Sequence, residues 1–431
     1  MKGWPTHPLA DFVASRAGNN KIIKGKQSDQ PGDGLVQAFS ASGPDVWVKT
    51  ADYNQPGVVI SAVGARCGKT FIAEGEWTAI ANTHVLLPGK EIDPRWLWYR
   101  TNEETFWIRG GSAQPFVKVK DTLQQPCKIP PLPEQQRIVG LLDEAFAGLA
   151  TAKANAEKNL QNARALFESH LQSVFTQRGK GWKQKTLEEI ATDFGRGKSK
   201  HRPRNAPHLY GGKYPFVQTG DVRNADHFIT GYTQTYSAAG LAQSKLWPKG
   251  TICITIAANI AETAILGFDA CFPDSVIGLV ANPKEAEVGF IEYLLQSFKA
   301  RIQAMGKGSA QANINMGTFE HERFPFPPVA EQKQIVATLD ELREKTQRLA
   351  SLYERKLAAL EALKKSLLHQ TFTGELGDEN AHASLHRWDA LSGLCQRVGH
   401  GPRALPWAVV ELPRWGCGIG RNSFPSPDGA S

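Results

Sequence analysis

The chain carries the stretch PPLPEQQRIV at residues 130–139 and a second version of it, PPVAEQKQIV, at residues 327–336. Matching positions lie 197 residues apart, and this spacing holds without a gap as far as Phe175 and Phe372. An internal repeat at a fixed spacing determines how many structural units a chain contains. The sequence therefore predicts two units, each consisting of a globular segment followed by one long helix.

A long helix is expected after each Pro-Pro pair. Glu134 and Glu331 fall in the first helical turn, where a carboxylate complements the positive end of the helix dipole. Apolar residues then recur at spacings of three and four, which predicts a coiled-coil seam with charged outer faces. The seam residues are Ile138, Leu142, Ala145, Leu149, Ala152, Ala156, Leu160, Ala163, Phe167, Leu171 and Val174, and then Ile335, Leu339, Leu342, Leu349, Tyr353, Leu357, Leu360 and Leu367.

The length of these helices requires a partner. At about 1.5 Å per residue, a helix over residues 134–175 would be roughly 60 Å long, longer than an ordinary globular helix. The other copy has the same register and is the nearest partner. A plain oligomerisation stalk would show the same seam. However, each helix is joined directly to its own globular segment, so pairing of the helices would fix the distance and orientation of two heads.

Composition limits the class of protein. A 431-residue chain with 41% hydrophobic residues can bury two or three cores. The net charge of +8 and the pI near 9.1 favour a polyanionic partner. No segment has the length of a membrane span and the N-terminus has no apolar signal core, so we expect a soluble cytoplasmic protein. The six cysteines form no C-x-x-C pair, which argues against a zinc site or a disulfide framework.

The two globular segments are predicted to share strands but not loops. Spacing between matching landmarks is 193 residues for Gly57 and Gly250 but 178 for Trp4 and Trp182. Expected buried strands are Val58–Val63 and Thr83–Leu87 in the first segment, and Gly250–Ile254 and Val276–Val280 in the second. The predicted domains are globular segments over 1–129 and 179–326, helices over 130–178 and 327–376, and a poorly ordered tail over 377–431. Conserved helix spacing with divergent loops suggests that the helices hold a shared architecture and the heads carry separate specificities.

The segment Gly64–Thr70 ends in Gly-Lys-Thr and follows a predicted strand, as a phosphate-binding P-loop does. A P-loop needs four residues between its two glycines so that successive N–H groups surround the phosphates. Only three residues separate Gly64 from Gly68. We therefore interpret the segment as a glycine turn that brings Arg66 or Lys69 to a DNA phosphate.

Residues 196–204 read RGKSKHRPR and contain five Arg or Lys residues without an acid. Such a run is often only a solvated loop. Glycine and proline make it an exposed loop, and its cations would neutralise several phosphates and release their counterions. The predicted phosphate contacts are Arg196, Lys198, Lys200, Arg202 and Arg204.

Polar side chains at three other turns are candidates for base contacts. Gln218 and Thr219 follow an apolar strand, and their side chains suit base edges in the major groove, although they could equally form a turn. The segments ending at Gln114 and Gln311, together with Asn313, are small and polar and occupy the same place in both copies. They predict either a shared contact or a shared turn.

Catalytic signatures are absent from the sequence. It contains no Asn/Asp-Pro-Pro-aromatic motif of an amino-methyltransferase and no nucleophile elbow. We expect a non-catalytic chain without a metal site or a cofactor of its own.

The repeated Pro-Pro-x-x-Glu-Gln-x-x-Ile-Val motif, each copy opening a long helix after a Gly-Ser-Ala-Gln turn, resembles the specificity subunit of type I restriction–modification enzymes over about residues 1–376. The resemblance implies an α+β fold in which two mixed α/β target recognition domains are joined by two antiparallel coiled-coil helices with an internal pseudo-twofold repeat. Each domain would recognise one half of a bipartite double-stranded DNA target, and the helices would set the spacer.

The resemblance also implies partners. The helices would dock two methyltransferase subunits, which use S-adenosylmethionine to methylate adenine. Motor–nuclease subunits that hydrolyse ATP with Mg²⁺ would join to cleave unmodified DNA. Two features depart from a strict repeat: the tail has no counterpart, and Lys364 stands where the first helix has Phe167.

Three alternatives remain open at this point. The chain could be an ATP-using enzyme built on residues 64–70, a coiled-coil scaffold without a nucleic-acid role, or the specificity module of a fused restriction enzyme that cuts on both sides of its site.

Overall fold

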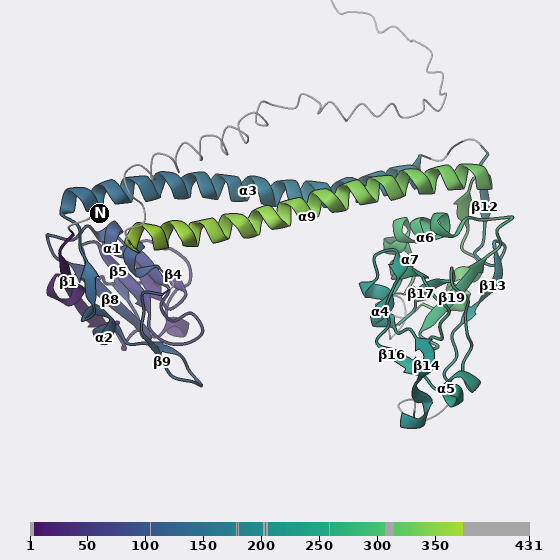
Figure 1. Cartoon of the computed structure of the whole chain (residues 1–431), viewed down its shortest axis with the longest axis horizontal. Coiled ribbons are helices and arrows are strands. Elements are labelled where there is room, and N and C mark those ends of the chain that lie inside the picture. The colour runs from purple at the N-terminus through teal and green to yellow at the C-terminus, as the bar shows by residue number, and fades with distance from the viewer. Residues whose placement is uncertain are drawn as a thin grey trace, which may run out of the picture. The chain divides into compact units, whose positions relative to one another are not determined.

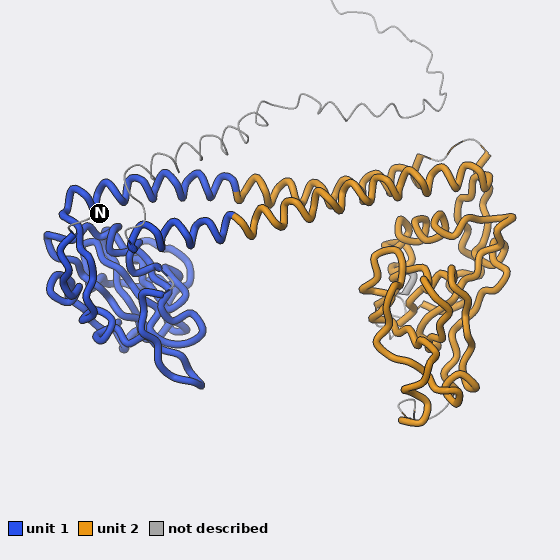
Figure 2. Tube along the Cα trace, in the orientation of Figure 1, with its two compact units in different colours: residues 1–152, 360–431 blue, residues 153–359 orange. Residues whose placement is uncertain are grey.

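The computed structural model describes residues 4–103, 105–177, 179, 181–200, 203, 206–257, 259–306 and 314–373. It divides into two compact units (Figure 2). Unit 1 comprises Met1–Ala152 and Leu360–Ser431, and unit 2 comprises Lys153–Ala359. The predicted tail over residues 377–431 lies outside the described residues. Within the described residues, no helix combines the length and apolar character that a membrane span needs.

Two helices of 45 residues each, α3 (Leu132–Thr176) and α9 (Val329–Thr373), join the two units (Figure 1). Unit 1 holds the beginning of α3 and the end of α9, and unit 2 holds the end of α3 and the beginning of α9. The two helices are therefore antiparallel. Every residue of the predicted seam is buried or half-buried, which explains why such long helices are stable as a pair.

Unit 1 is a mixed α/β domain built on a four-stranded antiparallel sheet with strand order β2-β8-β5-β6. A second sheet has the order β4-β3-β7. Its elements are β1 (Thr6–Pro8), η1 (Leu9–Asp11), β2 (Val13–Ala17), η2 (Lys24–Lys26), β3 (Val36–Ser40), β4 (Gly43–Val48), β5 (Gly57–Ser61), β6 (Thr70–Ala73), β7 (Trp77–Ala79), β8 (Thr83–Pro88), α1 (Pro94–Thr101), β9 (Arg109–Gly110), β10 (Phe116–Val117), α2 (Val119–Leu123) and β11 (Pro126–Lys128).

Unit 2 is also a mixed α/β domain, with a five-stranded sheet of order β13-β19-β17-β18-β15. Strands β14 and β16 form a separate pair. Its elements are β12 (Lys183–Lys185), β13 (Ala191–Arg196), η3 (Pro207–Leu209), β14 (Tyr210–Phe216), α4 (Thr219–Asn224), β15 (Phe228–Ile229), β16 (Gln234–Tyr236), α5 (Ala238–Ala242), β17 (Ile252–Thr255), β18 (Thr263–Leu266), β19 (Val276–Ala281), α6 (Val288–Ser297), α7 (Lys299–Gly306), α8 (Met316–Glu320) and β20 (Phe324–Phe326).

The two sheets share four strands in the same order, since β2-β8-β5-β6 corresponds to β13-β19-β17-β18. Their registers also match: Val59 pairs with Val85 in unit 1, and Ile252 pairs with Leu279 in unit 2. The units differ in what is inserted between the first and second of these strands in the chain. Unit 1 places β3 and β4 there, whereas unit 2 places β14, α4, β15, β16 and α5. The predicted combination of shared strands and divergent loops, and the predicted fold class, are confirmed.

A small two-stranded sheet closes each unit next to its long helix. In unit 1, β1 pairs with β11, which ends four residues before α3 begins. In unit 2, β12 pairs with β20, which ends three residues before α9 begins. Each pairing joins the start of a globular domain to the segment that leads into the helix.

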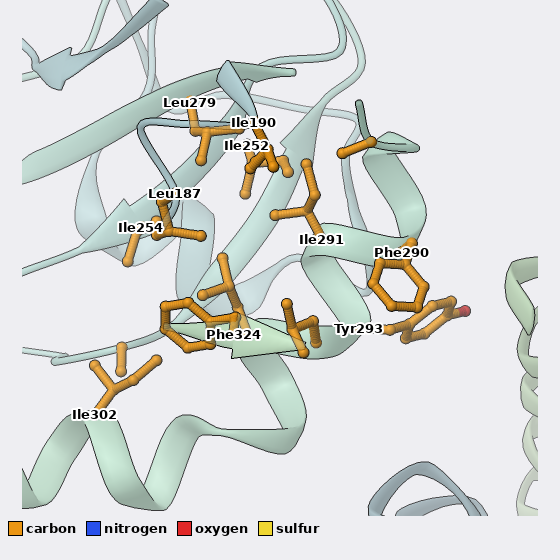
Figure 3. Close-up of a cluster of buried hydrophobic side chains, with 14 of the residues drawn as sticks. Leu187, Ile190, Ile252, Ile254, Leu279, Phe290, Ile291, Tyr293, Ile302 and Phe324 are labelled. Carbon is orange, nitrogen blue, oxygen red and sulfur yellow. The ribbon is translucent and has the colours of Figure 1, made fainter. Parts of the chain in front are cut away.

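Helix α6 forms the centre of the core of unit 2 (Figure 3). Seven of its ten residues are buried, as expected for a helix enclosed by other elements, and one of these, Glu292, is paired with His227 at 2.7 Å. One side packs with Ile252 and Leu279 of the sheet, and the same cluster includes Phe167 and Leu339 of the long helices. The globular domain and the helix pair of unit 2 therefore share one hydrophobic core.

Candidate nucleic-acid interface

The Gly64–Thr70 segment is the turn between β5 and β6. The N–H of Cys67 donates to the carbonyl of Gly64 at 2.9 Å, and Gly64 and Gly68 both have positive φ angles of 94° and 90°. A strand follows this turn, whereas a P-loop must lead into a helix. The segment is therefore not a P-loop. Arg66 and Lys69 are exposed on the turn, as a phosphate contact requires.

A second turn lies beside the first. The N–H of Gly64 donates to the carbonyl of Pro115 at 2.8 Å, which joins the β5–β6 turn to the β9–β10 hairpin. Gln114 is exposed at the tip of this hairpin. Gly111 has a φ of 81°, and a Cβ there would lie 2.3 Å from the Gln114 carbonyl oxygen, so only glycine fits. The structure thus brings together Arg66, Lys69 and Gln114 on adjacent turns, while Gln311 and Asn313 of the other copy lie outside the described residues.

The basic strip of unit 2 begins at the end of β13. Its backbone is held in place: the N–H of Gly197 donates to the Val276 carbonyl at 2.9 Å, and the Lys198 carbonyl accepts from Ser244 Oγ at 2.8 Å. Arg196 uses its Nε to donate to the Asp274 carbonyl at 2.7 Å. The side chains of Arg196, Lys198 and Lys200 are exposed, whereas Arg202 and Arg204 lie outside the described residues.

Gln218 and Thr219 begin α4. Gln218 is the N-cap residue, and its N–H donates to Asp221 Oδ2 at 2.8 Å. Both side chains are half-buried. Gln218 thus takes part in this turn through its backbone N–H. The segment before α4 and the basic strip both contact the backbone at Cys271 and Phe272. The Val217 N–H donates to the Cys271 carbonyl at 2.8 Å, and Gly197 packs against the carbonyl of Phe272.

The glutamine of the repeated motif fastens each domain to its helix in the same way. In unit 1 the buried side chain of Gln135 accepts from Asp93 N at 2.8 Å through Oε1, and its Nε2 donates to the carbonyls of Glu91 at 2.9 Å and Pro130 at 2.8 Å. Asp93 is the N-cap of α1, so one glutamine joins the first turn of α3 to the start of α1.

Unit 2 repeats this contact. Gln332 accepts from Glu287 N at 2.8 Å, and its Nε2 donates to the carbonyls of Glu285 at 3.2 Å and Pro327 at 2.8 Å. Glu287 is the N-cap of α6. The sequence pattern does not predict this structural role, although the repetition of the two glutamines at a spacing of 197 residues is a signal that points to them.

A family model described as the type I restriction modification DNA specificity domain matches residues 1–160 and 179–356, and so covers most of the chain. The chain belongs to this family. The specificity subunit of the type I restriction enzyme StySPI from Salmonella potsdam is 21% identical over 383 residues, covering 82% of this chain and 77% of that protein.

Two solved structures share the fold. The HsdS subunit from Thermoanaerobacter tengcongensis has a TM-score of 0.57 and 19% identity, covering 87% of this chain and 98% of its own. A chain from a study of complex assembly and conformational transition of the type I R–M system has a TM-score of 0.68 and 18% identity, covering 86% and 98%. The present chain is thus a DNA specificity subunit of a type I restriction–modification system and is not itself catalytic, as predicted.

In this specificity subunit a tyrosine–aspartate hydrogen bond provides a second contact between each domain and its helix. Tyr99 of α1 donates to Asp143 Oδ1 at 2.5 Å, and Tyr293 of α6 donates to Asp340 Oδ1 at 2.6 Å. Burial and the bond to the carboxylate raise the pKa of both tyrosines. In unit 1, Arg95 also forms an ion pair with Asp143 at 2.8 Å.

Replacing Tyr293 by Phe is expected to destabilise unit 2 by about 1.5–3 kcal/mol at pH 8, because a hydrogen bond to a charged group is lost. This difference should shrink as the pH rises above about 10. There the unfolded tyrosine ionises while the folded one stays protonated, which costs the wild type about 1.4 kcal/mol per pH unit. Urea unfolding of the wild type and of Tyr293→Phe at pH 8 and 11 measures the difference in the free energy of unfolding. Tyr232→Phe, at a tyrosine that is 47% exposed, is the control, and a constant difference would contradict the prediction.

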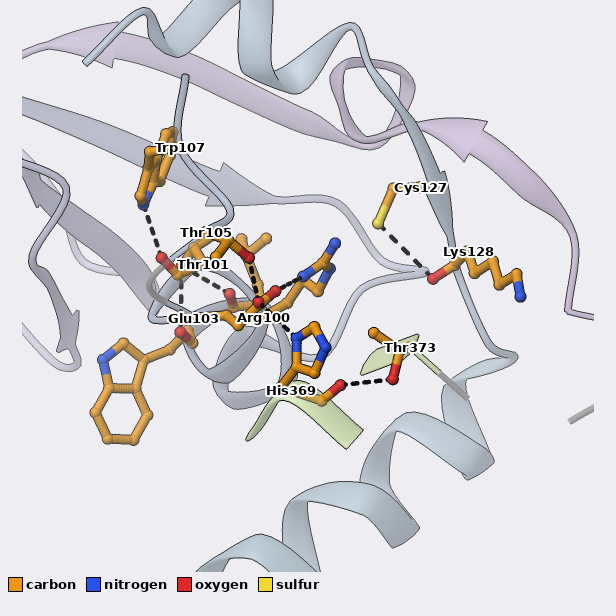
Figure 4. A network of polar contacts seen from close by, with 11 residues as sticks. Arg100, Thr101, Glu103, Thr105, Trp107, Cys127, Lys128, His369 and Thr373 are labelled. Carbon is orange, nitrogen blue, oxygen red and sulfur yellow. Dashed lines mark hydrogen bonds and ion pairs between the residues drawn. The ribbon is translucent and has the colours of Figure 1, made fainter. Parts of the chain in front are cut away.

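The end of α9 is fixed in unit 1 by a polar group around Glu103 (Figure 4). Glu103 forms an ion pair with Arg100 at 2.6 Å and a contact with His369 Nδ1 at 3.2 Å. Burial raises the pKa of Glu103, but hydrogen bonds from Thr105, His369 and Arg100 outweigh it, so the pKa lies below the ordinary value. Within the described residues, no cluster of His, Cys, Asp or Glu side chains could hold a metal ion.

Proposed function

We propose that the specificity subunit recognises an asymmetric, bipartite DNA sequence, with one half contacted by each unit. The target recognition domains comprise residues 1–129 and 179–326, and the helices over 130–178 and 327–376 set the length of the uncontacted spacer. The observation that carries this proposal is that both domains are held on the helices by matching contacts, while the segments inserted between β2 and β5 and between β13 and β17 differ.

The DNA contacts proposed for each unit follow the exposed turns. In unit 1, Arg66 and Lys69 bind phosphates and Gln114 contacts bases. In unit 2, the strip formed by Arg196, Lys198 and Lys200 binds the backbone, and the start of α4 with Gln218 and Thr219 contacts bases. We assign Arg202 and Arg204 to the same strip, and Gln311 and Asn313 to the same role as Gln114.

The partners follow from the family. We propose that the helices carry two methyltransferase subunits and that motor–nuclease subunits join the same complex. S-adenosylmethionine, ATP and Mg²⁺ belong to these partner subunits, and the specificity subunit holds no cofactor. A complex that acts on host and incoming DNA implies a cytoplasmic location.

The test is to co-express the full chain with its methyltransferase partner and to map adenine methylation across the host genome. A single bipartite motif with a fixed gap is the expected result. Absence of methylation despite a stable complex would contradict the proposal and favour a scaffold. Methylation accompanied by cutting on both sides of the site by one polypeptide partner would indicate the fused-enzyme alternative.

Gln114→Ala should relax the motif in only one of its halves. Loss of one amide contact to a base costs about 1–3 kcal/mol of discrimination. Sites with a substitution at one or two positions of that half should therefore be methylated roughly 5- to 100-fold more than they are by the wild type. The other half and the gap should not change. Ser112→Ala, at an exposed residue of the same hairpin, is the control. Relaxation in both halves would show that the effect is not a local base contact.

A further inference from the structure

Each unit contains one cation–π contact between the long helices. In unit 2 the Arg343 guanidinium of α9 lies 5.4 Å from the centre of the Phe167 ring of α3. In unit 1 the Lys364 ammonium of α9 lies 5.4 Å from the centre of the Phe146 ring of α3. The repeat spacing of 197 residues makes Phe146 equivalent to Arg343 and Phe167 equivalent to Lys364. The same contact is thus made twice, with the aromatic and the cation exchanged between equivalent positions.

This exchange explains why Lys364 departs from the repeat. Replacing each residue by its equivalent 197 positions away turns the pair of unit 1 into the pair of unit 2. If the repeat were strict, Phe167 would face an equivalent of Phe146, and no cation–π contact would form. The departure keeps the contact, and it gives α3 both aromatic residues and α9 both cations.

The distribution matters for pairing with a second copy of the chain. If two α9 helices paired antiparallel in this register, Arg343 of each would face Lys364 of the other, and like charges repel. If two α3 helices paired, Phe146 would face Phe167, which is a favourable contact. The heterologous pair of α3 with α9 is the one that matches each aromatic ring with a cation.

An ion pair on the outer face has the same bias. Arg164 of α3 and Glu354 of α9 lie 2.7 Å apart. Their repeat equivalents are Glu361 and Glu157, respectively. Two paired α9 helices would place Glu354 opposite Glu361, whereas two α3 helices would place Arg164 opposite Glu157. At both positions, pairing of two α9 helices would therefore bring like charges together.

We propose that α9 is a selective pairing surface, which accepts α3 and rejects the α9 of a second copy of the chain. The selectivity is carried by Arg343 and Lys364, with support from Glu354 and Glu361. It goes beyond DNA recognition, because it governs which helices pair when many copies of a chain with two similar helices fold together.

The test exchanges the unit 1 pair in the full chain, as Phe146→Lys/Lys364→Phe. This variant retains a cation–π pair in each unit, but each helix then carries one aromatic residue and one cation. Two α9 helices can therefore pair with each aromatic ring facing a cation. Lys364→Phe alone has the same effect on α9 and leaves α3 unchanged, which keeps the test valid if the double variant folds poorly. Lys364→Arg keeps the cation and is the control.

Pairing is measured by co-refolding two tagged forms of the full chain, one with Glu354→Cys and one with Glu361→Cys, and by quantifying the disulfide-linked mixed dimer. Both variants carrying Lys364→Phe should raise the yield of the mixed dimer at least about five-fold over the unexchanged chain. In a pair of α9 helices, two repulsive contacts between cations are then replaced by two cation–π contacts. Lys364→Arg should leave the yield unchanged. Equal yields for all chains, or an equal rise with Lys364→Arg, would overturn the proposal.

Discussion

Gln332→Leu is expected to lower the free energy of unfolding of unit 2 by about 2–5 kcal/mol. The substitution removes three hydrogen bonds and leaves a buried backbone group of Pro327 and part-buried backbone groups of Glu285 and Glu287 without their partner. Domains of this size have only about 5–15 kcal/mol of stability, so the loss is a large fraction of it. The first turn of α6 should lose its protection from hydrogen exchange before the rest of the unit does, since its cap is held by this side chain.

Gln334→Leu is the matched control, because Gln334 lies two residues further along α9 and is exposed. It should change stability by less than about 0.5 kcal/mol. Unit 1 offers the same comparison between the buried Gln135 and the exposed Gln136. Urea unfolding together with hydrogen exchange of α1 and α6 measures both pairs. If the buried and exposed glutamines gave equal losses, these side chains would not fasten the domains to the helices.

Arg196→Ala/Lys198→Ala/Lys200→Ala should weaken binding to every duplex, whatever its sequence. If all three side chains bind phosphates, the slope of log affinity against log salt concentration should fall by about 2.7, since each contact contributes about 0.9. Affinity at low salt should drop roughly 100-fold or more, while the preferred sequence stays the same. Titrations of the full chain with its methyltransferase partner, over a series of salt concentrations, measure both quantities.

Lys183→Ala/Lys284→Ala/Lys333→Ala is the charge-matched control. These three exposed lysines lie in β12, in the loop before α6 and near the start of α9. The control removes the same net charge, so it separates a contact from a general change in the electrostatic field. Equal slopes for the two triple variants would show that the strip does not contact DNA directly.

Much of the architecture was predictable because one spacing runs through the helices. The seam positions, the pairing of α3 with α9 and the shared strands follow from it, and the observed register of Val59 with Val85 and of Ile252 with Leu279 agrees with the predicted equivalence of Gly57 and Gly250. The tyrosine–aspartate bonds could not be predicted from the repeat spacing. Asp143 and Asp340 are 197 residues apart, but Tyr99 and Tyr293 are 194 apart, so no single offset reveals the pair.

The candidate DNA contacts were only partly predictable. Residue type identified Arg66, Lys69 and the strip at 196–200, and the structure exposes all of these side chains. Sequence could not separate the two roles of Gln218, because a glutamine at the start of a helix can form part of the turn and can also contact a base. Nor could it show that Gln114 lies on a turn adjacent to Arg66, since that depends on a backbone bond between Gly64 and Pro115.

The discontinuity of unit 1 has a consequence for synthesis on the ribosome. Unit 2 is one continuous stretch of 207 residues, but unit 1 needs the end of α9, where Leu368 and Phe372 complete its core. At about 5–20 residues per second, the ribosome needs roughly 10–40 s to translate the stretch that separates the two parts of unit 1. During that time the start of α3 has an open apolar face, while unit 2 can fold as it emerges. The first domain to be made is therefore the last to be finished.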